Sequence, residues 1–448
     1  MKPTLPKGTR DFLPSEVKKR RYIFDTIRSV FESYGYDPIE TPVMESLTTL
    51  TGKYGDEGDQ LLFKVLNNGD YLNKADAKAL EEKNSQKLIS SISKRGLRYD
   101  LTVPFARFVV MHQNEIQFPF KRYQIQQVWR ADRPQKGRYQ EFYQCDADIV
   151  GSDSLMYEAE LTAIYDTAFY KLGISVTIKY NNRKILYGIT EAAGVADRFR
   201  DITVCIDKLD KIGEEGVRKE LEKNSIESMA VDVILTLLKV KDINDLILPF
   251  ESSETGQEGL NETKEFLSYL SSYNSKNSIV FDPTLARGLS YYTGCIFEVV
   301  ADDIVMGSIG GGGRYADLTG VFGLKGVSGV GVSFGAERIY DVMLELGLFD
   351  DISAVSSQVI ILTFDKECHS YAFAKANDLR NAGIETEVYP SPVKMKKQMK
   401  YANSKGIPNV IIIGDEEMKS GRLTLKDMES GKSDQYSIKE IIEKLGTK

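Results

Sequence analysis

The sequence is poor in histidine, with only His112 and His369 among 448 residues. This scarcity argues against a catalytic triad centred on histidine and against a metal site built from several histidines. The four cysteines lie far apart and form no Cys-x-x-Cys pair, which argues against a zinc knuckle and a disulfide framework. Catalysis must therefore come from other groups.

Long apolar runs are also missing. No stretch of about 18 apolar residues occurs, and the opening MKPTLP lacks the apolar core of a signal peptide. We therefore expect a cytoplasmic protein that makes no use of a membrane. The length of 448 residues allows about two to three domains, each able to bury its own core.

The net charge of −7 is unevenly distributed, at +2 from Val355 to Lys448 and −9 over the rest of the chain. Phosphate recognition requires a local positive surface rather than a basic whole, so nucleic-acid binding is not excluded. Ordinary compositional scatter is the alternative explanation of the difference.

Hydrophobic periodicity predicts a first helix over about 16–34, ended by Gly35. A long β-hairpin is predicted downstream, because the side chains alternate in character from Arg122 to Trp129 and a return strand is expected from Tyr139 to Asp148. A basic loop, Arg133–Arg138, joins the two strands.

Other segments of the first 345 residues show weaker patterns. We expect an extended edge strand at 36–42, a strand at 61–66, a polar helix within 74–93, a helix at 155–172, a strand at 174–180, a loop at 252–259 and renewed strands from 278. Residues 183–276 are mainly helical and charged, which favours an insertion into one domain. The less favoured alternative is that they are part of its core.

The tail has a different rhythm. After a short linker at 346–357, strands alternate with helices, which predicts a small α/β domain over 358–448. Its predicted elements are a strand at 359–364, a helix at 367–382, a strand at 386–389, a helix at 393–405 and a strand at 410–414.

Several patches outside the hairpin have residues suited to ligand binding. Asp100 and Thr102 would face one side of a strand if their segment is extended. The segment 285–294 combines Arg287 with two tyrosines and two glycines. Further on, a small-residue strand from Gly329 leads into a helix near Gly335.

The glycine run at 310–313 lacks the spacing and the lysine of a phosphate-binding loop. A nucleotide cradle is therefore less favoured than a flexible or tightly packed backbone. Taken singly, such an aspartate more often caps a turn, such tyrosines belong to a core, and such arginines lie on the surface. Their joint occurrence, in a chain without another credible nucleophile or metal cluster, favours a binding site.

Together these residues resemble the class II aminoacyl-tRNA synthetases, and within them the histidyl-tRNA synthetases. Lys7–Pro14 is similar to that family's N-terminal signature. The three class motifs are matched by Glu40–Pro42, by Arg130–Phe142 and by Gly335–Arg338, and the two histidine motifs by Arg98–Thr102 and Arg287–Tyr292. The tail resembles the anticodon-binding domain of the same subgroup.

The resemblance implies an α+β fold: an antiparallel catalytic sheet flanked by helices in residues 1–345, a helical insertion at about 183–276, and an α/β anticodon-binding domain at 358–448. It also implies ATP-dependent ligation of L-histidine to tRNA(His) through a histidyl-adenylate. Mg²⁺ would offset charge on the departing phosphates, with no metal site built from the protein alone. A homodimer through the region around Pro42 is implied as well.

The implied roles are as follows. The resemblance implies that Arg130 and Arg287 are the catalytic residues. Both would also contact the histidine substrate, together with Asp100, Thr102, Gln144, Asp148, Tyr291 and Tyr292. ATP would be bound by Arg130, Asp132, Tyr139, Phe142 and Arg338. The loop residues Gln135, Lys136 and Arg138 would contact the tRNA acceptor end, or else form a solvated hairpin tip.

Three other functions stay open on the sequence alone. One is a catalytically silent regulatory subunit of histidine biosynthesis, although Arg130, Arg287, Arg338 and the tail are all present. The second is a tRNA-sensing module of a stress kinase, although no kinase sequence occurs. The third is a different class II synthetase, such as a prolyl or threonyl enzyme, which the segment from Arg287 to Tyr292 disfavours.

Overall fold

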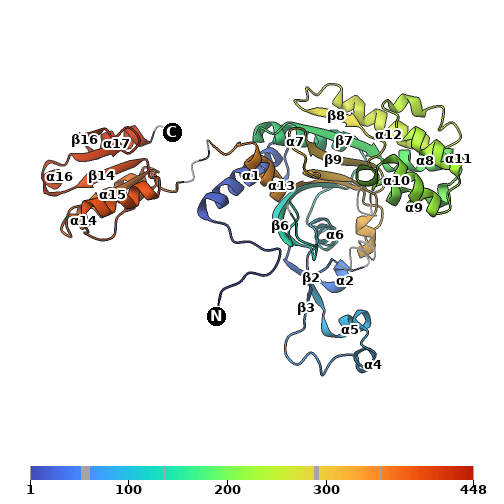
Figure 1. Ribbon diagram of the computed structural model, residues 1–448, viewed down its shortest axis with the longest axis horizontal. Coiled ribbons are helices and arrows are strands. Elements are labelled where there is room, and N and C mark those ends of the chain that lie inside the picture. The colour runs from blue at the N-terminus through green and yellow to red at the C-terminus, as the bar shows by residue number, and fades with distance from the viewer. Residues whose placement is uncertain are drawn as a thin grey trace. The chain divides into compact units, whose positions relative to one another are not determined.

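The structure is a computed structural model that describes residues 2–51, 61–135, 137–286, 292–350, 352 and 355–446. The chain divides into two compact units, residues 1–11 with 20–349 and residues 12–19 with 350–448 (Figure 1). Helices and mainly antiparallel strands make up the first unit, which confirms the α+β class. The exact domain limits given above stay a prediction.

The first unit is built on one large sheet. In the described residues its eight strands follow the order β1 (Asp37–Pro38), β5 (Phe120–Trp129), β6 (Glu141–Val150), β11 (Gly329–Gly335), β10 (Gly310–Tyr315), β9 (Cys295–Ala301), β7 (Val176–Asn182) and β8 (Ser278–Phe281). The short edge pairs β1–β5 and β7–β8 are parallel and all the other pairs are antiparallel. The predicted antiparallel catalytic sheet is confirmed.

The predicted hairpin forms its centre. Phe120–Trp129 pairs with Glu141–Val150 over ten residues, so the return strand begins and ends two residues later than its pattern suggested. Side chains opposite each other in such a ladder share one face of the sheet. The even-numbered residues of both strands therefore share one face, and the odd-numbered residues share the other.

Helices α1 (Pro14–Ser33), α7 (Met156–Leu172) and α13 (Ala336–Glu345) cover the odd-numbered face. Phe31 shows the packing, because its ring centroid lies 5.6 Å from that of Tyr123 on β5 and 5.7 Å from that of Phe334 on β11. Figure 1 shows α1 and α13 on one side of the curved strand β6 and α6 on the other.

Helix α6 (Thr102–Met111) covers part of the even-numbered face, where Phe105 lies under the Arg122 guanidinium at 4.3 Å. A smaller sheet of β2 (Met44–Ser46), β4 (Arg95–Leu97) and β3 (Lys64–Val65) adjoins it, with the short helices α2 (Leu47–Leu50), α4 (Ala77–Glu81) and α5 (Ser85–Ile92). The strand predicted at 61–66 is therefore only two residues long.

Residues 183–276 are helical as predicted, with α8 (Arg183–Ala192), η1 (Ala196–Arg198), α9 (Phe199–Ile206), α10 (Leu209–Lys223), α11 (Ser228–Leu237), η2 (Ile243–Leu246) and α12 (Glu254–Leu270). The loop predicted at 252–259 is wrong. Ser253 caps α12 by accepting the Gly256 amide, and a Cβ on Gly256 or Gly259 would collide with its neighbours. These glycines permit close packing rather than a turn.

The remaining short helix of this unit, η3 (Leu318–Phe322), follows β10. The glycine run belongs to β10 itself, and a Cβ on Gly312 would lie 2.2 Å from the carbonyl oxygen of Gly331 on β11. At Gly312 the glycines thus serve tight strand packing, as one of the two interpretations above had it.

The second unit has its own sheet, ordered β13 (Thr386–Val388), β12 (Val359–Thr363), β14 (Asn409–Ile413), β15 (Leu423–Asp427) and β16 (Ser433–Tyr436). One apolar cluster under α14 (Cys368–Asn381) and α17 (Ile438–Leu445) and another under α15 (Met395–Ser404) bury its two faces; α16 (Asp415–Ser420) follows β14. The predicted strand–helix alternation is confirmed, and the antiparallel pair β15–β16 extends it. Among the described residues, no helix is long and apolar enough to cross a membrane.

Candidate active site

A pocket of about 290 Å³ opens on the even-numbered face, near the loop of the hairpin. Ten residues predicted from the sequence line it: Asp100, Thr102, Arg130, Asp132, Arg138, Tyr139, Phe142, Gln144, Tyr292 and Arg338. They come from segments up to 238 positions apart in the sequence, from Asp100 to Arg338. Polar and aromatic side chains converging in one cavity are typical of a ligand site.

Three predicted residues, Lys136, Arg287 and Tyr291, lie outside the described residues. Two described ones, Gln135 and Asp148, do not line this pocket. Pro42 lies exposed just before β2, and its carbonyl oxygen accepts a hydrogen bond from Arg98 at 3.3 Å.

Arg130 is held at the end of β5 by its surroundings. Its Nε donates to the Tyr99 carbonyl at 3.2 Å, and its Nη2 donates to Gln144 Oε1 at 3.3 Å. The guanidinium also lies 4.4 Å from the Tyr99 ring centre and 5.1 Å from that of Phe142. Aromatic contacts and hydrogen bonds fix its plane, so the cation is oriented before any anion arrives.

Arg338, on the first turn of α13, ties two loops together across the pocket wall. Its Nε donates to the Gly137 carbonyl at 3.0 Å and its Nη1 to the Ser308 carbonyl at 2.5 Å. The hairpin tip is itself closed by two backbone hydrogen bonds between Gln135 and Arg138. Arg138 also pairs with Asp132, with 3.3 Å between Nε and Oδ2.

Asp100 and Thr102 do not lie on a strand, contrary to the condition set for them above. Asp100 sits in the turn before α6, where its carboxylate accepts the backbone amide of Val103 at 3.1 Å. Thr102 is the first residue of that helix. The short side chain of aspartate competes for local backbone amides in this way, which is why a helix begins where extension was considered.

Asp148 is buried beneath α6 instead of lining the pocket. Its Oδ2 lies 2.6 Å from Nη2 of Arg122, and its Oδ1 accepts the Tyr315 hydroxyl at 2.9 Å. Gly331 leaves room for this carboxylate, since a Cβ there would lie 1.9 Å from Oδ1. Burial raises the pKa of Asp148, while Arg122 opposes the rise.

Sequence reasoning missed Arg122, Tyr315, Ser333 and Glu337 as parts of this site. Arg122 lies directly opposite Asp148 in the β5–β6 ladder. The alternating pattern contained that pairing, but only the observed register reveals it.

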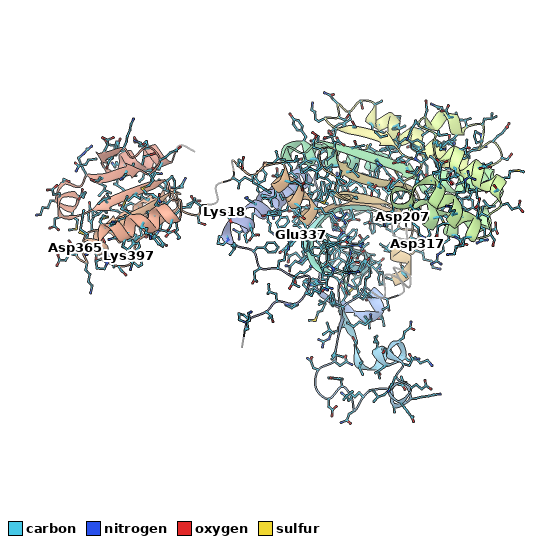
Figure 2. The ribbon with its side chains drawn as sticks, viewed as in Figure 1. Lys18, Asp207, Asp317, Glu337, Asp365 and Lys397 are labelled. Carbon is cyan, nitrogen blue, oxygen red and sulfur yellow. The ribbon has the colours of Figure 1, made fainter. Side chains whose placement is uncertain are left out.

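Glu337, labelled in Figure 2, lines the pocket from α13 and is held by two arginines of the N-terminal region. Arg20 binds both of its carboxylate oxygens, at 2.5 and 2.7 Å. Arg10 binds Oε2 at 2.6 Å and lies 3.5 Å above the ring centre of Tyr139. The signature segment at 7–14 thus supports the pocket wall through Arg10.

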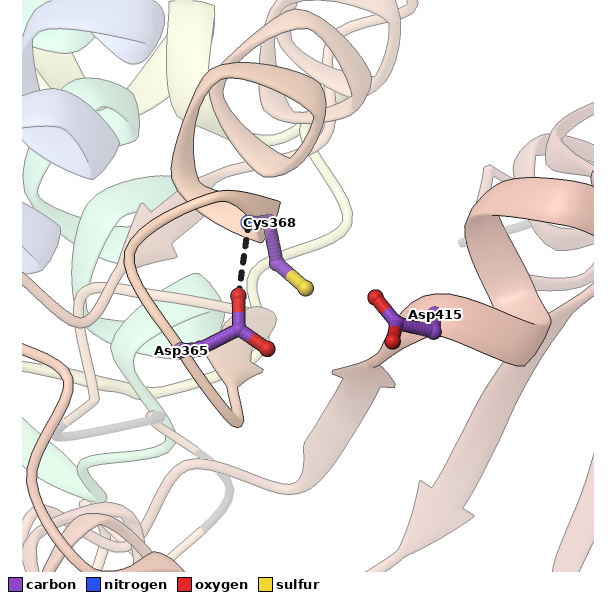
Figure 3. A group of neighbouring side chains, drawn as sticks. All are labelled: Asp365, Cys368 and Asp415. Carbon is purple, nitrogen blue, oxygen red and sulfur yellow. Dashed lines mark hydrogen bonds between the residues drawn. The ribbon is translucent and has the colours of Figure 1, made fainter.

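Within the described residues one group of side chains has a spacing that could hold a metal ion: Asp365, Cys368 and Asp415 in the second unit (Figure 3). A simpler role explains it. The Asp365 carboxylate accepts the backbone amides of Glu367 and Cys368 and so begins α14. Burial and Asp365 raise the pKa of the Cys368 thiol to about 11, which keeps it protonated and a poor metal ligand.

The fold and the pocket together define a class of protein. A mainly antiparallel sheet with a central polar hairpin, a cavity holding one arginine from that hairpin and another from the helix after β11, and a separate α/β unit are the features of a class II aminoacyl-tRNA synthetase.

Comparison with known proteins narrows the class. The family model described as histidyl-tRNA synthetase matches residues 8–72 and 69–339, and the model described as anticodon binding domain matches 358–448. The chain belongs to the histidyl-tRNA synthetase family.

Individual relatives agree with the family model. The chain is 54% identical to the histidine–tRNA ligase of Bacteroides fragilis over 446 residues, which cover 98% of each protein, and 54% identical to that of Christiangramia forsetii over 438 residues, 96% of each. Its fold matches the crystal structure of histidyl-tRNA synthetase from Nostoc sp. PCC 7120 with a TM-score of 0.84, at 30% identity and 99% coverage of both chains. Such full-length matches to ligases do not favour a regulatory subunit.

Proposed function

We propose that this protein ligates L-histidine to tRNA(His), with a histidyl-adenylate as intermediate and with AMP and pyrophosphate as products. The observation that carries the proposal is the single pocket that holds Arg130, Arg338, Phe142 and Gln144 together. The guanidinium of Arg130 suits a phosphate group, and the amide of Gln144 suits a polar amino acid. The ring of Phe142 and the guanidinium of Arg338 suit the two faces of an adenine ring.

In the first step the histidine carboxylate attacks the α-phosphorus of ATP, and pyrophosphate leaves. Both reactants are anions, so a cation must lie where charge grows in the transition state. Arg130 supplies this cation, since its guanidinium is already oriented by Tyr99 and Gln144. Arg287 is proposed as its partner.

The adenine ring is proposed to lie between Phe142 and Arg338. Tyr139 stands beside them in the wall and is itself stacked on Arg10. Mg²⁺ enters with ATP as part of the substrate and offsets phosphate charge. It needs few protein ligands, because phosphates and water fill most of its shell. Asp132 would offer its Oδ1 for this, since its Oδ2 pairs with Arg138, whereas both oxygens of Glu337 already bind arginines.

The histidine substrate is proposed to bind on the deeper side of the pocket. Asp100, Thr102 and Gln144 would receive its ammonium group, and Tyr291 and Tyr292 its ring. Because Asp148 is engaged by Arg122 and Tyr315 beneath α6, we assign it an indirect part in ring recognition. A site with such fixed polar groups can reject analogues that lack the matching ones by roughly 10⁴ to 10⁵-fold.

In the second step the terminal ribose hydroxyl of tRNA attacks the adenylate. Gln135, Lys136 and Arg138 at the hairpin tip are proposed to contact the acceptor end, and residues 358–448 the anticodon. We therefore propose that the protein works in the cytoplasm, where its tRNA substrate is found.

Aminoacylation of tRNA transcripts with labelled histidine tests the whole proposal. We expect charging of tRNA(His) and none of a transcript for another amino acid. The matched variant Gln135→Ala should keep adenylate formation and lose transfer. Equal charging of unrelated tRNAs, or no charging of any tRNA, would contradict the proposed function.

A further inference from the structure

Three polar side chains form a row across the sheet, below the pocket. Asp146 on β6 lies directly opposite Gln124 on β5 and directly opposite Ser333 on β11. Gln124 and Asp146 are almost fully buried, with 1% and 2% of their surfaces exposed. All three share the even-numbered face with Gln144, which lines the pocket one step nearer the hairpin loop.

Asp146 and Ser333 fix the side-chain amide of Gln144. Its Nε2 donates to Ser333 Oγ at 2.8 Å and to Asp146 Oδ1 at 3.3 Å, while its Oε1 accepts from Arg130. The two ends of the amide are therefore not interchangeable. Asp146 thus acts, through Gln144, on both the proposed ammonium site and the proposed catalytic arginine.

The amide of Gln124 is also fixed, and it leaves an unused acceptor. Its Nε2 donates to Thr41 Oγ1 at 2.8 Å and to Gln126 Oε1 at 2.5 Å. Gln126 Oε1 in turn accepts from Arg98 and so must be an oxygen. Gln124 Oε1 is consequently a true acceptor, and it is buried without a hydrogen-bond partner among the residues that the structure describes. Leaving such an acceptor unsatisfied costs about 1–3 kcal/mol.

We propose that Asp146 is a positioning residue that works as a neutral carboxylic acid. Its hydroxyl donates to Gln124 Oε1, the neighbour across the ladder, and its other oxygen accepts from Gln144. One buried proton then satisfies the unused acceptor and sets the orientation of Gln144 and Arg130. The inference rests on the proposed function in that its effect is felt at the histidine site.

Burial of Asp146 favours its neutral form, while the charges around it act in both directions. Several titratable groups of the described part of the chain interact with it. Two carboxylates repel its charge, two guanidinium groups attract it, and a thiol and a phenol also contribute: Asp100, Asp148, Arg98, Arg122, Cys145 and Tyr165. Burial above all raises the pKa of Asp146 to about 7. Arg122 is the largest opposing effect, Asp148 and Asp100 add to the rise, and a hydrogen bond with Ser333 also opposes it. The acid is therefore poised to ionise near neutral pH.

Two substitutions separate a neutral acid from a carboxylate. Asp146→Ala removes both hydrogen bonds and should raise KM for histidine in pyrophosphate exchange by about tenfold or more, the equivalent of one hydrogen bond of about 1.4 kcal/mol. Asp146→Asn keeps a donor for Gln124 and an acceptor for Gln144, so it should restore KM to within about threefold of wild type. An Asn variant as impaired as the Ala variant would show that the negative charge is required, and would overturn the proposal.

The pH dependence gives a second readout. Between about pH 6.5 and 8.5, KM for histidine should rise in wild type relative to Asp146→Asn at each pH, because ionised Asp146 would face the bare oxygen of Gln124. Taking the ratio at each pH cancels the ionisation of free histidine itself. A ratio that stays constant across this range would contradict the inference.

The pH dependence of thermal stability tests whether Asp146 is protonated, without relying on enzyme activity. The unfolded carboxyl ionises near pH 3.9 and the folded one at a higher pH, so wild-type stability falls as pH rises through that interval and then stays level. The Tm advantage of Asp146→Asn over wild type should widen from about pH 5 to about pH 7 and level off above about pH 8. A Tm difference between Asp146→Asn and wild type that does not change with pH would contradict the proposal that Asp146 is a neutral acid. If wild type showed no histidine-dependent exchange, the proposed function would fail, while this series would still decide the state of Asp146.

Discussion

At the scale of single residues, Arg130 is the group that the proposed chemistry needs most. Its guanidinium is held by the Tyr99 carbonyl, by Gln144 and by two aromatic rings, so it is oriented before substrate binds. A preorganised cation of this kind stabilises the transition state more than a mobile one, because it does not have to reorganise as the reaction proceeds.

Arg130→Ala should lower kcat for histidine-dependent pyrophosphate exchange by about 10² to 10³-fold, in the range found when one oriented donor to a developing charge is removed. Arg130→Lys is the matched control. Its kcat should lie between those of wild type and Arg130→Ala, since lysine keeps the positive charge but lacks the planar guanidinium. An Ala variant within a few-fold of wild type would remove Arg130 from the mechanism.

The buried pair Arg122–Asp148 predicts a loss of stability. Asp148→Leu alone leaves the Arg122 cation uncompensated and should destabilise the fold by about 3–5 kcal/mol. The double variant Arg122→Met, Asp148→Leu should recover most of this loss, because two apolar groups can replace a buried ion pair. Urea unfolding of the three proteins measures it, and a double variant no more stable than the single one would contradict this view of the pair.

Individual site residues were predictable from the sequence where a motif placed them, as for Arg130, Phe142 and Gln144 on the hairpin. The local structure and the burial of the site residues were less predictable. Asp100 was considered on a strand and instead begins a helix, because one hydrogen bond to the Val103 amide decides the local structure. The depth of Asp148 depends on α6 lying over it, which a pattern along one strand does not contain.

At the scale of elements, the backbones of β10 and β11 pack closely beside the pocket. A Cβ on Gly312 would lie 2.2 Å from the Gly331 carbonyl oxygen, whereas one on Gly311 would lie 3.4 Å from its nearest neighbour, the Phe297 carbonyl oxygen. The two adjacent glycines therefore have different reasons to be there.

Gly312→Ala should destabilise the protein by about 1–3 kcal/mol, because neither backbone can move away without breaking the ladder. Gly311→Ala, one residue away, is the matched control and should cost less than about 1 kcal/mol. Denaturant midpoints of the two variants compare them directly. Equal losses would mean that the sheet relaxes around the added methyl group.

Elements with strong periodicity were found where the sequence placed them, including α1, the hairpin and the strands and helices of the tail. Those that depend on tertiary contacts were not. The start of α12 was mistaken for a loop because serine and glycine are typical of turns. In the structure a Cβ on Gly188 of α8 would lie 2.7 Å from the Gly256 Cα, and a Cβ on Gly256 would collide with Ser253 and Phe250. These glycines are explained by the close packing of α12 against α8, which the sequence of α12 alone does not reveal.

At the scale of the whole molecule, exposed basic residues of the second unit bear on tRNA binding. Lys396, Lys397 and Lys400 lie exposed along α15 (Figure 2 labels Lys397). Charge reversal of all three should raise KM for tRNA(His) by about tenfold or more at low salt, with pyrophosphate exchange unchanged. Reversal of Lys432 and Lys439, exposed in the same unit, is the control and should have a smaller effect.

The proposed homodimer can be tested at the segment after Pro42. Val43 and Met44 leave 42% and 48% of their surfaces exposed, although both are apolar. Met44→Glu should weaken self-association, because a charge in an apolar contact loses its hydration. Sedimentation velocity would show a dimer for wild type and more monomer for the variant; a monomeric wild type would refute the dimer.

The central claim is that this pocket activates histidine and no other amino acid. Exchange of labelled pyrophosphate into ATP, measured with each of the twenty amino acids in turn, tests it most directly. We predict strong exchange with histidine alone and its loss in Arg130→Ala. Exchange driven by a different amino acid, or none with histidine, would contradict the account.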